Sequence, residues 1–308
     1  MEQKQGNMET EQTGQAKESA EISSTAEILT SVFNEIESRA TGTATPGIPI
    51  NFYDFDAITQ GLQRGSLIVI AGRPAMGKTS LCLNIAKNVA QIHDLPVCLF
   101  GLEMSKECYT YRLLSMEVGI NSGRLRTGRL QQDEWPLLGK GIEALGQFPL
   151  FINDRCDITV EEIHATCEKI KKEKGNGDLG LVVIDYIQLM DGPVYPSRDE
   201  ELSKIIVQLK DMAKQLNVPV ILMSQLNRDI EERINKRPML SDLRETQALE
   251  SHADLVVMMY RDEYYDPDTC DRGITELITC KHRNGPLGTV KLLLEPQFTR
   301  FRNLMDVV

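Results

Sequence analysis

Short apolar runs alternate with amphipathic stretches from about residue 50 to the end of the chain. The runs have the length and composition of buried strands. In chain order they are SLIVIAG, VCLFGLE, LGLVVID, VPVILMSQ, DLVVMMYR, TELITCKHR and TVKLLLE. This alternation predicts an α/β fold in which a mostly parallel, twisted sheet carries helices on both faces. Ligands of such sheets bind at the carboxyl ends of the strands.

Two of the amphipathic stretches have apolar residues at helical spacing, which predicts one buried face on each helix. The faces consist of Leu81, Ile85, Val89 and Ile92 on one helix, and of Leu202, Ile205, Ile206, Leu209, Met212, Ala213 and Leu216 on the other. The last two apolar runs are joined by RNGPLG. This connection predicts an antiparallel hairpin at the sheet edge.

The N-terminal part of the chain has a different pattern. Residues 1–22 are rich in polar side chains, and we expect them to be disordered because they bury too little to offset the entropy of ordering. Residues 23–48 form a predicted helix and a connector, and residues 49–308 form the main domain. The helix has a capping box at Ser24 and Glu27. Its apolar stripe comprises Leu29, Val32, Phe33 and Ile36.

That stripe needs a partner surface because so short a helix is unstable alone. The partner is either the helix's own domain or a neighbouring subunit, and the stripe by itself does not decide between them. We find no internal repeat.

Composition narrows the class of protein. The chain has 308 residues, 41% of them hydrophobic, and a formal net charge of −11. This charge argues against a protein that coats nucleic acid with its whole surface, although it allows a local basic path. The sequence predicts a soluble, cytoplasmic protein that does not contact membranes, because it lacks a signal-peptide pattern and a long apolar span. The seven cysteines are expected to be reduced thiols.

The segment AGRPAMGKTS follows the first apolar run and matches a phosphate-binding loop. A helix that begins there offers free N–H groups and a positive dipole end to phosphate. Lys78 is expected to reach the β and γ oxygens, and the Thr79 hydroxyl to bind Mg²⁺. The alternative is a glycine-rich turn that only links strand to helix. The predicted nucleotide-binding residues are Gly72, Arg73, Pro74, Ala75, Met76, Gly77, Lys78, Thr79 and Ser80.

Polar residues at three other strand ends complete a predicted catalytic site. Asp185 ends LVVID and is expected to hold the metal, unless it only caps a turn. Glu103 ends VCLFGLE and is the predicted general base, with a helix N-cap as the alternative. Gln225 ends VPVILMSQ, where its amide is predicted to sense the γ-phosphate; ordinary strand-end hydrogen bonding is the other interpretation.

Lys281 and Arg283 project from the same face of a predicted strand, because residues i and i+2 point together. On a monomer the pair would be a solvated surface. In a ring it would reach a neighbour's nucleotide and stabilise the transition-state charge as an arginine finger.

Several motifs in this order resemble the C-terminal motor domain of DnaB-type replicative DNA helicases, within the RecA-like ATPases. The resemblance covers residues 22–303. The motifs are GRPAMGKT, GLEMS, RLRTGRL before DEW, LVVIDYIQLM, NVPVILMSQLNR, RPMLSDLRETQALESHADLVVMMYRD and KHRNGPLGTVKL.

The resemblance implies a hexameric ring that hydrolyses ATP with Mg²⁺ at subunit interfaces and moves 5′ to 3′ along single-stranded DNA. It supports the roles given above and adds Arg112, nine residues after Glu103, as a contact to the γ-phosphate in its own subunit. The helix at residues 25–39 would dock on the adjacent motor domain.

Two pore loops would contact DNA in such a ring. Arg198 is the cation of the first loop. Arg244, Glu245 and Gln247 belong to the second, where ETQ replaces the family's usual ESG. Family members usually carry an N-terminal collar that recruits primase, whereas a polar tail stands before the helix here. We therefore expect a truncated or specialised member, or one without primase coupling.

Two other functional classes stay open. One is a RecA-like or RadA-like recombinase that forms filaments. The other is an ATP-dependent loader or regulatory module that does not unwind DNA.

Overall fold

The computed structural model describes residues 23–190, 197–243 and 246–304. The chain divides into two compact units, Met1–Ala44 and Thr45–Val308. The predicted disorder of residues 1–22 therefore concerns a segment outside the described residues. Within the part of the chain that is described, no helix is both long enough and apolar enough to cross a membrane.

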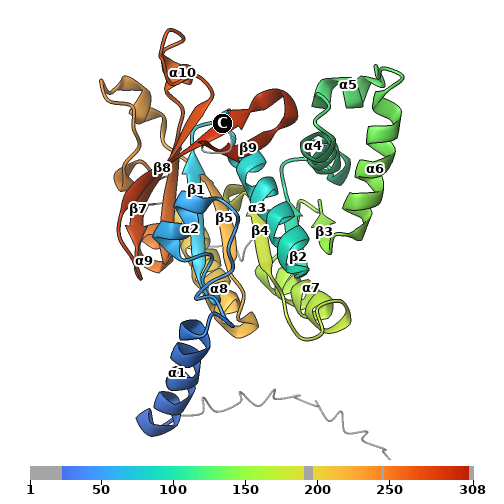
Figure 1. Ribbon diagram of the computed structural model, residues 1–308. Coiled ribbons are helices and arrows are strands. Elements are labelled where there is room, and N and C mark those ends of the chain that lie inside the picture. Colours follow the sequence, from blue (N-terminus) through green and yellow to red (C-terminus); the bar gives the residue numbers. More distant parts are fainter. Residues whose placement is uncertain (1–22, 191–196, 244–245, 305–308) are drawn as a thin grey trace, which may run out of the picture. The chain divides into compact units, whose positions relative to one another are not determined.

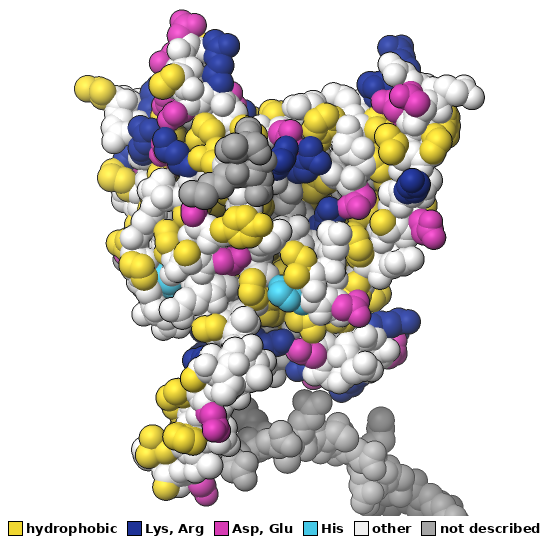
Figure 2. Space-filling model, viewed as in Figure 1, with side chains coloured by type: hydrophobic (Ala, Val, Ile, Leu, Met, Phe, Trp, Pro, Cys, Tyr) yellow, Lys and Arg dark blue, Asp and Glu magenta, His cyan; other side chains and the backbone are white. Residues whose placement is uncertain are grey.

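The first unit contains helix α1, Thr25–Ala40. The predicted capping box is present: the Glu27 amide donates to Ser24 Oγ at 3.3 Å, and the Ser24 amide donates to Glu27 Oε2 at 2.8 Å. Apolar side chains lie along this helix (Figure 2), and Leu29 and Phe33 are 60% and 66% exposed. The helix thus carries an uncovered apolar stripe.

The second unit is built around one sheet, with the strand order β3-β2-β4-β5-β1-β6-β7-β8-β9 (Figure 1). The strands from β3 to β6 in this order are parallel, and β7, β8 and β9 are antiparallel to their neighbours. Their bounds are β1 Leu67–Gly72, β2 Val97–Gly101, β3 Leu150–Asn153, β4 Leu181–Asp185, β5 Val220–Gln225, β6 Leu255–Tyr260, β7 Ile274–His282, β8 Gly288–Glu295 and β9 Arg300–Asn303.

Helices cover both faces of the parallel part, so the central strands are continuous apolar runs until their carboxyl ends, where Asp185 ends β4 and Ser224 and Gln225 end β5. Alternate residues of β1 face opposite sides: Val69 packs in the core beneath α7, α8 and α9, whereas Ile70 packs with α2, α3 and α4. The helices of this unit are α2 Tyr53–Thr59, α3 Lys78–His93, α4 Lys106–Val118, α5 Ser122–Thr127, α6 Glu134–Gln147, α7 Val160–Glu173, α8 Arg198–Leu216, α9 Thr246–His252 and α10 Asp262–Tyr265.

Short 3₁₀ turns connect several of these elements, at Ile187–Leu189, Arg228–Glu232, Leu240–Asp242 and Pro296–Phe298. Helices α4, α5 and α6 pack together on one flank, beside the β2 and β3 edge (Figure 1). This flank and the carboxyl ends of the parallel strands enclose the candidate site.

The α/β prediction is confirmed, with two corrections at the sheet edges. All seven predicted strands form, but β3 and β9 are additional. The β7–β8 hairpin is antiparallel as predicted but does not form the edge, because β9 pairs with β8 beyond it. Seven predicted core residues of α8 are buried, whereas Ile92 on α3 is 51% exposed.

Candidate active site

A cavity of about 530 Å³ opens at the carboxyl ends of the parallel strands. Strand register brings the tips together, because Gly72 of β1 pairs with Gln225 of β5 and Gly101 of β2 pairs with Asp185 of β4. The cavity is lined by Pro74, Ala75, Gly77, Lys78, Thr79, Ser80, Glu103, Met104, Cys108, Tyr111, Arg112, Ser122, Arg126, Asp185, Tyr186, Gln225, Arg261, Leu294, Pro296 and Thr299. Its size suits a small organic ligand with several charged groups.

The loop between β1 and α3 presents backbone donors to this cavity. Gly77 is the N-cap of α3 and has φ +96°, a conformation that favours glycine. No side chain caps the helix there, so its first N–H groups are free to bind an anion. A Cβ at Gly77 would lie 3.2 Å from Cζ of Phe301, which makes the position tight as well as left-handed.

Lys78 is the cation of the loop. Its Nζ donates to the carbonyl oxygens of Gly72 at 2.6 Å and Arg73 at 3.1 Å. Burial lowers the pKa of Lys78 to about 8, although the nearby Asp185 and Glu103 carboxylates act to raise it. A phosphate in the cavity would give the Lys78 ammonium a full negative charge to pair with, where it now has only two carbonyl oxygens.

Thr79 and Asp185 form the predicted metal pair. Thr79 Oγ1 lies 3.0 Å from Oδ2 of Asp185, a carboxylate that is 98% buried. Burial raises the pKa of Asp185, whereas hydrogen bonds from Tyr109 and Thr79 lower it. A hydroxyl and a carboxylate are hard oxygen donors of the kind that Mg²⁺ prefers, and this ion keeps water and phosphate oxygens as its other ligands. The residues present therefore fit a nucleotide-bound magnesium ion.

Glu103, Gln225 and Arg112 all line the same cavity. Glu103 follows β2 and is exposed. The N-cap of α4 is Ser105, whose side chain accepts from the Cys108 amide. Helix capping, the alternative interpretation of Glu103, is therefore wrong, and its carboxylate is available to the cavity.

Two loop side chains that were expected to bind nucleotide point elsewhere. Arg73 donates to Glu231 Oε1 at 2.7 Å and to the Leu226 carbonyl at 3.1 Å. Met76 is 1% exposed and packs in the core. The side chains of these two residues, like Gly72, do not line the cavity. Any contact they make to a ligand would come from the backbone.

Lys281 and Arg283 lie together but outside the cavity. Both donate to the Ser251 carbonyl, Lys281 at 3.4 Å and Arg283 at 2.6 Å, which confirms that they share a face. Arg283 also forms an ion pair with Asp254 at 3.2 Å. The pair therefore does not contact the phosphate loop of its own chain.

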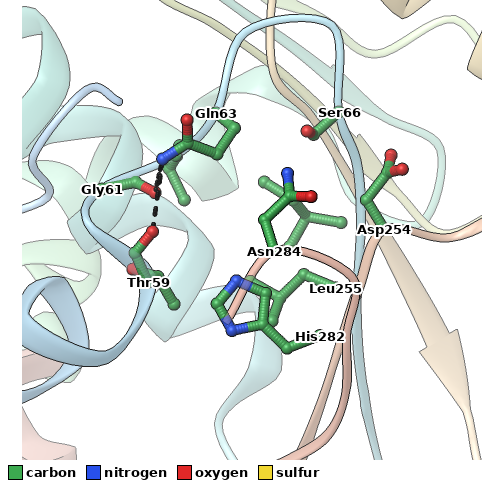
Figure 3. Close-up of a pocket in the computed structure, with 10 residues that line it drawn as sticks. Thr59, Gly61, Gln63, Ser66, Asp254, Leu255, His282 and Asn284 are labelled. Atoms are coloured by element: carbon green, nitrogen blue, oxygen red, sulfur yellow. Dashed lines mark hydrogen bonds between the residues drawn. The ribbon is translucent and has the colours of Figure 1, made fainter. Parts of the chain in front are cut away.

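A second cavity lies near this hairpin (Figure 3). Thr59, Gly61 and Gln63 lie on one side of it, with Asp254 and His282 on the other. Its volume of about 10 Å³ is that of a single water molecule, so it is not a substrate site.

The residues predicted to contact DNA are only partly described. Arg198 lies at the start of α8, where it donates to the carbonyls of Gln188 and Met190 and pairs with Glu201 at 2.6 Å. Arg244 and Glu245 lie outside the described residues, as do residues 191–196 of the first loop. Gln247 belongs to α9.

Three contributors were not singled out from the sequence. Arg126 on α5 and Arg261 after β6 add cations to the cavity wall. Arg261 also donates to the Ala75 carbonyl at 3.1 Å. Tyr109 donates to Asp185 Oδ2 at 3.0 Å. The RLRTGRL motif was a signal for Arg126, whereas nothing in the sequence distinguishes Tyr109 from other helical tyrosines.

Comparison with known proteins agrees with this geometry. Residues 47–303 match the family described as DnaB-like helicase C terminal domain. A probable replicative DNA helicase of Trieres chinensis is 44% identical over 91% of this chain and 62% of its own length. The replicative DNA helicase DnaC of Bacillus subtilis is 41% identical over 95% of this chain and 64% of its own. The chain thus spans less than two thirds of these relatives.

Solved structures with the same architecture include an ATPase domain with a TM-score of 0.87 and 37% identity. That match covers 92% of this chain and 100% of the other. A DnaB-like replicative helicase, described with its interactions with primase, has a TM-score of 0.83 and 37% identity. That match covers 92% of this chain and 68% of the other.

Proposed function

Because the chain belongs to the family of DnaB-like helicase C-terminal domains, we propose that it is the ATP-driven motor of a replicative DNA helicase. The observation that carries the proposal is the cavity in which a phosphate loop, the Thr79–Asp185 pair and Glu103 meet. This combination can bind a nucleoside triphosphate and hydrolyse it.

The roles follow from the positions of the side chains. Lys78 and the first N–H groups of α3 would hold the phosphates, and Thr79 and Asp185 would hold Mg²⁺, which when bound supplies positive charge to the phosphate oxygens. Glu103 would take a proton from the attacking water. Arg112 and Gln225 would contact the γ-phosphate and respond to its loss.

A ring of identical subunits, a homo-hexamer, would complete the site. Lys281 and Arg283 lie outside their own cavity, which supports an action on a neighbour's nucleotide. Arg283 would have to exchange Asp254 for that phosphate. Each subunit would then supply the phosphate loop of one site and the cationic pair of the next.

Helix α1 is the proposed assembly element. Its exposed stripe needs a partner, and α6 of the second unit offers the exposed apolar residues Trp135, Leu137 and Ile142. We assign α6 of another copy as the chemically matching surface. Docking there would remove both apolar faces from water.

Single-stranded DNA is the proposed substrate of the moving ring, contacted by Arg198, Arg244, Glu245 and Gln247. Contacts to the DNA backbone would make binding independent of sequence and sensitive to salt. Arg198 would exchange its bond to Glu201 for phosphate. A primase or a helicase loader is the proposed class of protein partner, and the cytoplasm the proposed compartment.

A forked DNA duplex with a 5′ single-stranded tail tests the function. The protein is expected to displace the strand with ATP and Mg²⁺, whereas Lys78→Ala loses nucleotide binding and Arg283→Ala loses hydrolysis in the ring. Assembled rings that hydrolyse ATP and displace no strand would contradict helicase activity and favour a loader or regulatory module. Filaments in electron micrographs would favour a recombinase.

A further inference from the structure

Tyr109 of α4 is fully buried, and its hydroxyl donates to Oδ2 of Asp185 at 3.0 Å. Thr79 Oγ1 lies at the same distance from the same oxygen. Two hydroxyls from different helices therefore converge on one buried carboxylate oxygen. A buried carboxylate needs such donors because water does not reach it to replace them.

Gly101 makes this contact possible. It ends β2 and pairs directly with Asp185 of β4, so a side chain there would stand beside the carboxylate. A Cβ at Gly101 would lie 2.1 Å from Cε2 and 2.7 Å from the hydroxyl oxygen of Tyr109. The tyrosine ring thus occupies the space that any side chain at Gly101 would fill.

The two hydroxyls have different roles under the proposed function. Thr79 would give a lone pair of its oxygen to the metal ion, with its hydroxyl hydrogen still directed at Asp185. The Tyr109 hydroxyl would remain on Oδ2, because its ring is fully buried and packs against Gly101 of β2. Groups that orient a metal-binding carboxylate in this way commonly contribute ten- to hundredfold to metal affinity.

We propose that Tyr109 is a positioning residue that holds the Asp185 carboxylate in the orientation required by the nucleotide-bound Mg²⁺ ion. The proposal rests on the proposed function, because it assigns the metal to Thr79 and Asp185. Tyr109 acts through Asp185 and makes no contact with the ion.

The test measures binding and not turnover. The fluorescent nucleotide MANT-ADP is titrated into the full chain in EDTA and at increasing Mg²⁺. Tyr109→Phe removes only the hydroxyl, so its affinity in EDTA is expected to stay within about twofold of the wild type. The Mg²⁺ concentration that gives half of the metal-dependent gain in affinity is expected to rise about tenfold.

Tyr53→Phe is the control, because Tyr53 is an exposed tyrosine of α2 that does not line this cavity. It is expected to keep the wild-type Mg²⁺ requirement. Gly101→Ala is a second route to the same defect, since its methyl group would displace the Tyr109 ring. The double variant Gly101→Ala/Tyr109→Phe is expected to need no more Mg²⁺ than the more impaired of the two single variants. Both changes remove the same hydrogen bond, from Tyr109 to Asp185.

A Tyr109→Phe protein that unfolds at lower temperature but keeps its Mg²⁺ requirement would overturn the positioning role. If Mg²⁺ does not change the affinity of the wild-type protein for MANT-ADP, both this proposal and the proposed metal site are overturned. Wild-type binding that depends on Mg²⁺, with a raised requirement in Tyr109→Phe, would support the role of Tyr109 even if no duplex is unwound.

Discussion

Arg283 forms an ion pair with Asp254 of its own chain, with Nη1 3.2 Å from Oδ1. The other oxygen of Asp254 accepts from Lys210 Nζ at 2.6 Å and from the Leu67 amide at 2.8 Å. Asp254 therefore holds the proposed trans-acting arginine against the sheet. The two ion pairs differ in exposure, because the Arg283 side chain is 46% exposed and that of Lys210 only 11%.

Mixed rings test whether Arg283 acts across an interface. Arg283→Ala and Lys78→Ala subunits are each expected to lack ATPase activity. Mixing them should restore part of it, because some interfaces then combine an intact Lys78 with an intact Arg283. Activity is measured across mixing ratios at constant total protein. If subunits exchange and no mixing ratio restores activity, then Arg283 does not act on the nucleotide of a neighbouring subunit in sites that work independently.

Asp254→Asn is expected to lower the free energy of unfolding by about 3 kcal/mol, because it removes the charged partner of the buried Lys210 ammonium and leaves only its hydrogen bond to the Gly65 carbonyl. Asparagine keeps an acceptor for the Leu67 amide. Urea denaturation of the nucleotide-free protein measures the change. Arg283→Ala is the control and should change stability by less than about 1 kcal/mol, since its ion pair is exposed. Equal losses in the two variants would refute the buried role of the Lys210 pair.

Lys78 predicts a pH dependence of stability in the nucleotide-free protein. Its pKa in the folded state is about 8, below the ordinary 10.5, so the unfolded chain binds more protons between these values. Stability from this group therefore rises as the pH increases from about 8 to 10.5. Lys78→Met should remove that rise and be the more stable protein at pH 7, by up to about 3 kcal/mol. A stability difference between the two proteins that is constant over this range would contradict the lowered pKa.

The exposed stripe of α1 predicts an effect on assembly. Phe33→Glu places a charge on the apolar face and is expected to lower the assembled mass measured by light scattering. Asn34→Glu adds the same charge on the opposite face and should leave the mass unchanged. Deletion of residues 1–39 should act like Phe33→Glu. A full-sized assembly after this deletion would show that α1 is not required.

The sequence predicted the parallel sheet because its central strands are buried on both faces and therefore appear as continuous apolar runs. β3 and β9 were missed for the opposite reason. Both are only four residues long, and β9, with the sequence RFRN, has a single apolar side chain. Their pairing depends on neighbours that are distant in the sequence.

Local motifs placed Lys78, Thr79 and Asp185 in one cavity. Lys78 and Thr79 begin the helix that follows β1, Asp185 ends β4, and the fold brings these positions to the same edge of the sheet. The direction in which Arg73 points was not predictable, since its partner Glu231 is 158 residues away. Tyr109 was missed because its role depends on a missing side chain at Gly101 in the neighbouring strand. Such contacts are set by packing between elements and not by periodicity.

Helix α9 connects two parts of the proposed machine. Its first residue follows the segment that contains Arg244 and Glu245, and carbonyl oxygens in its last turn accept hydrogen bonds from Lys281 and Arg283. The helix is seven residues long, so it spans only about two turns. Movement of the end next to Arg244 and Glu245 would be transmitted along this short helix to Lys281 and Arg283 at its other end. The proposed contact with DNA and the proposed contact with the neighbour's phosphate would then change together.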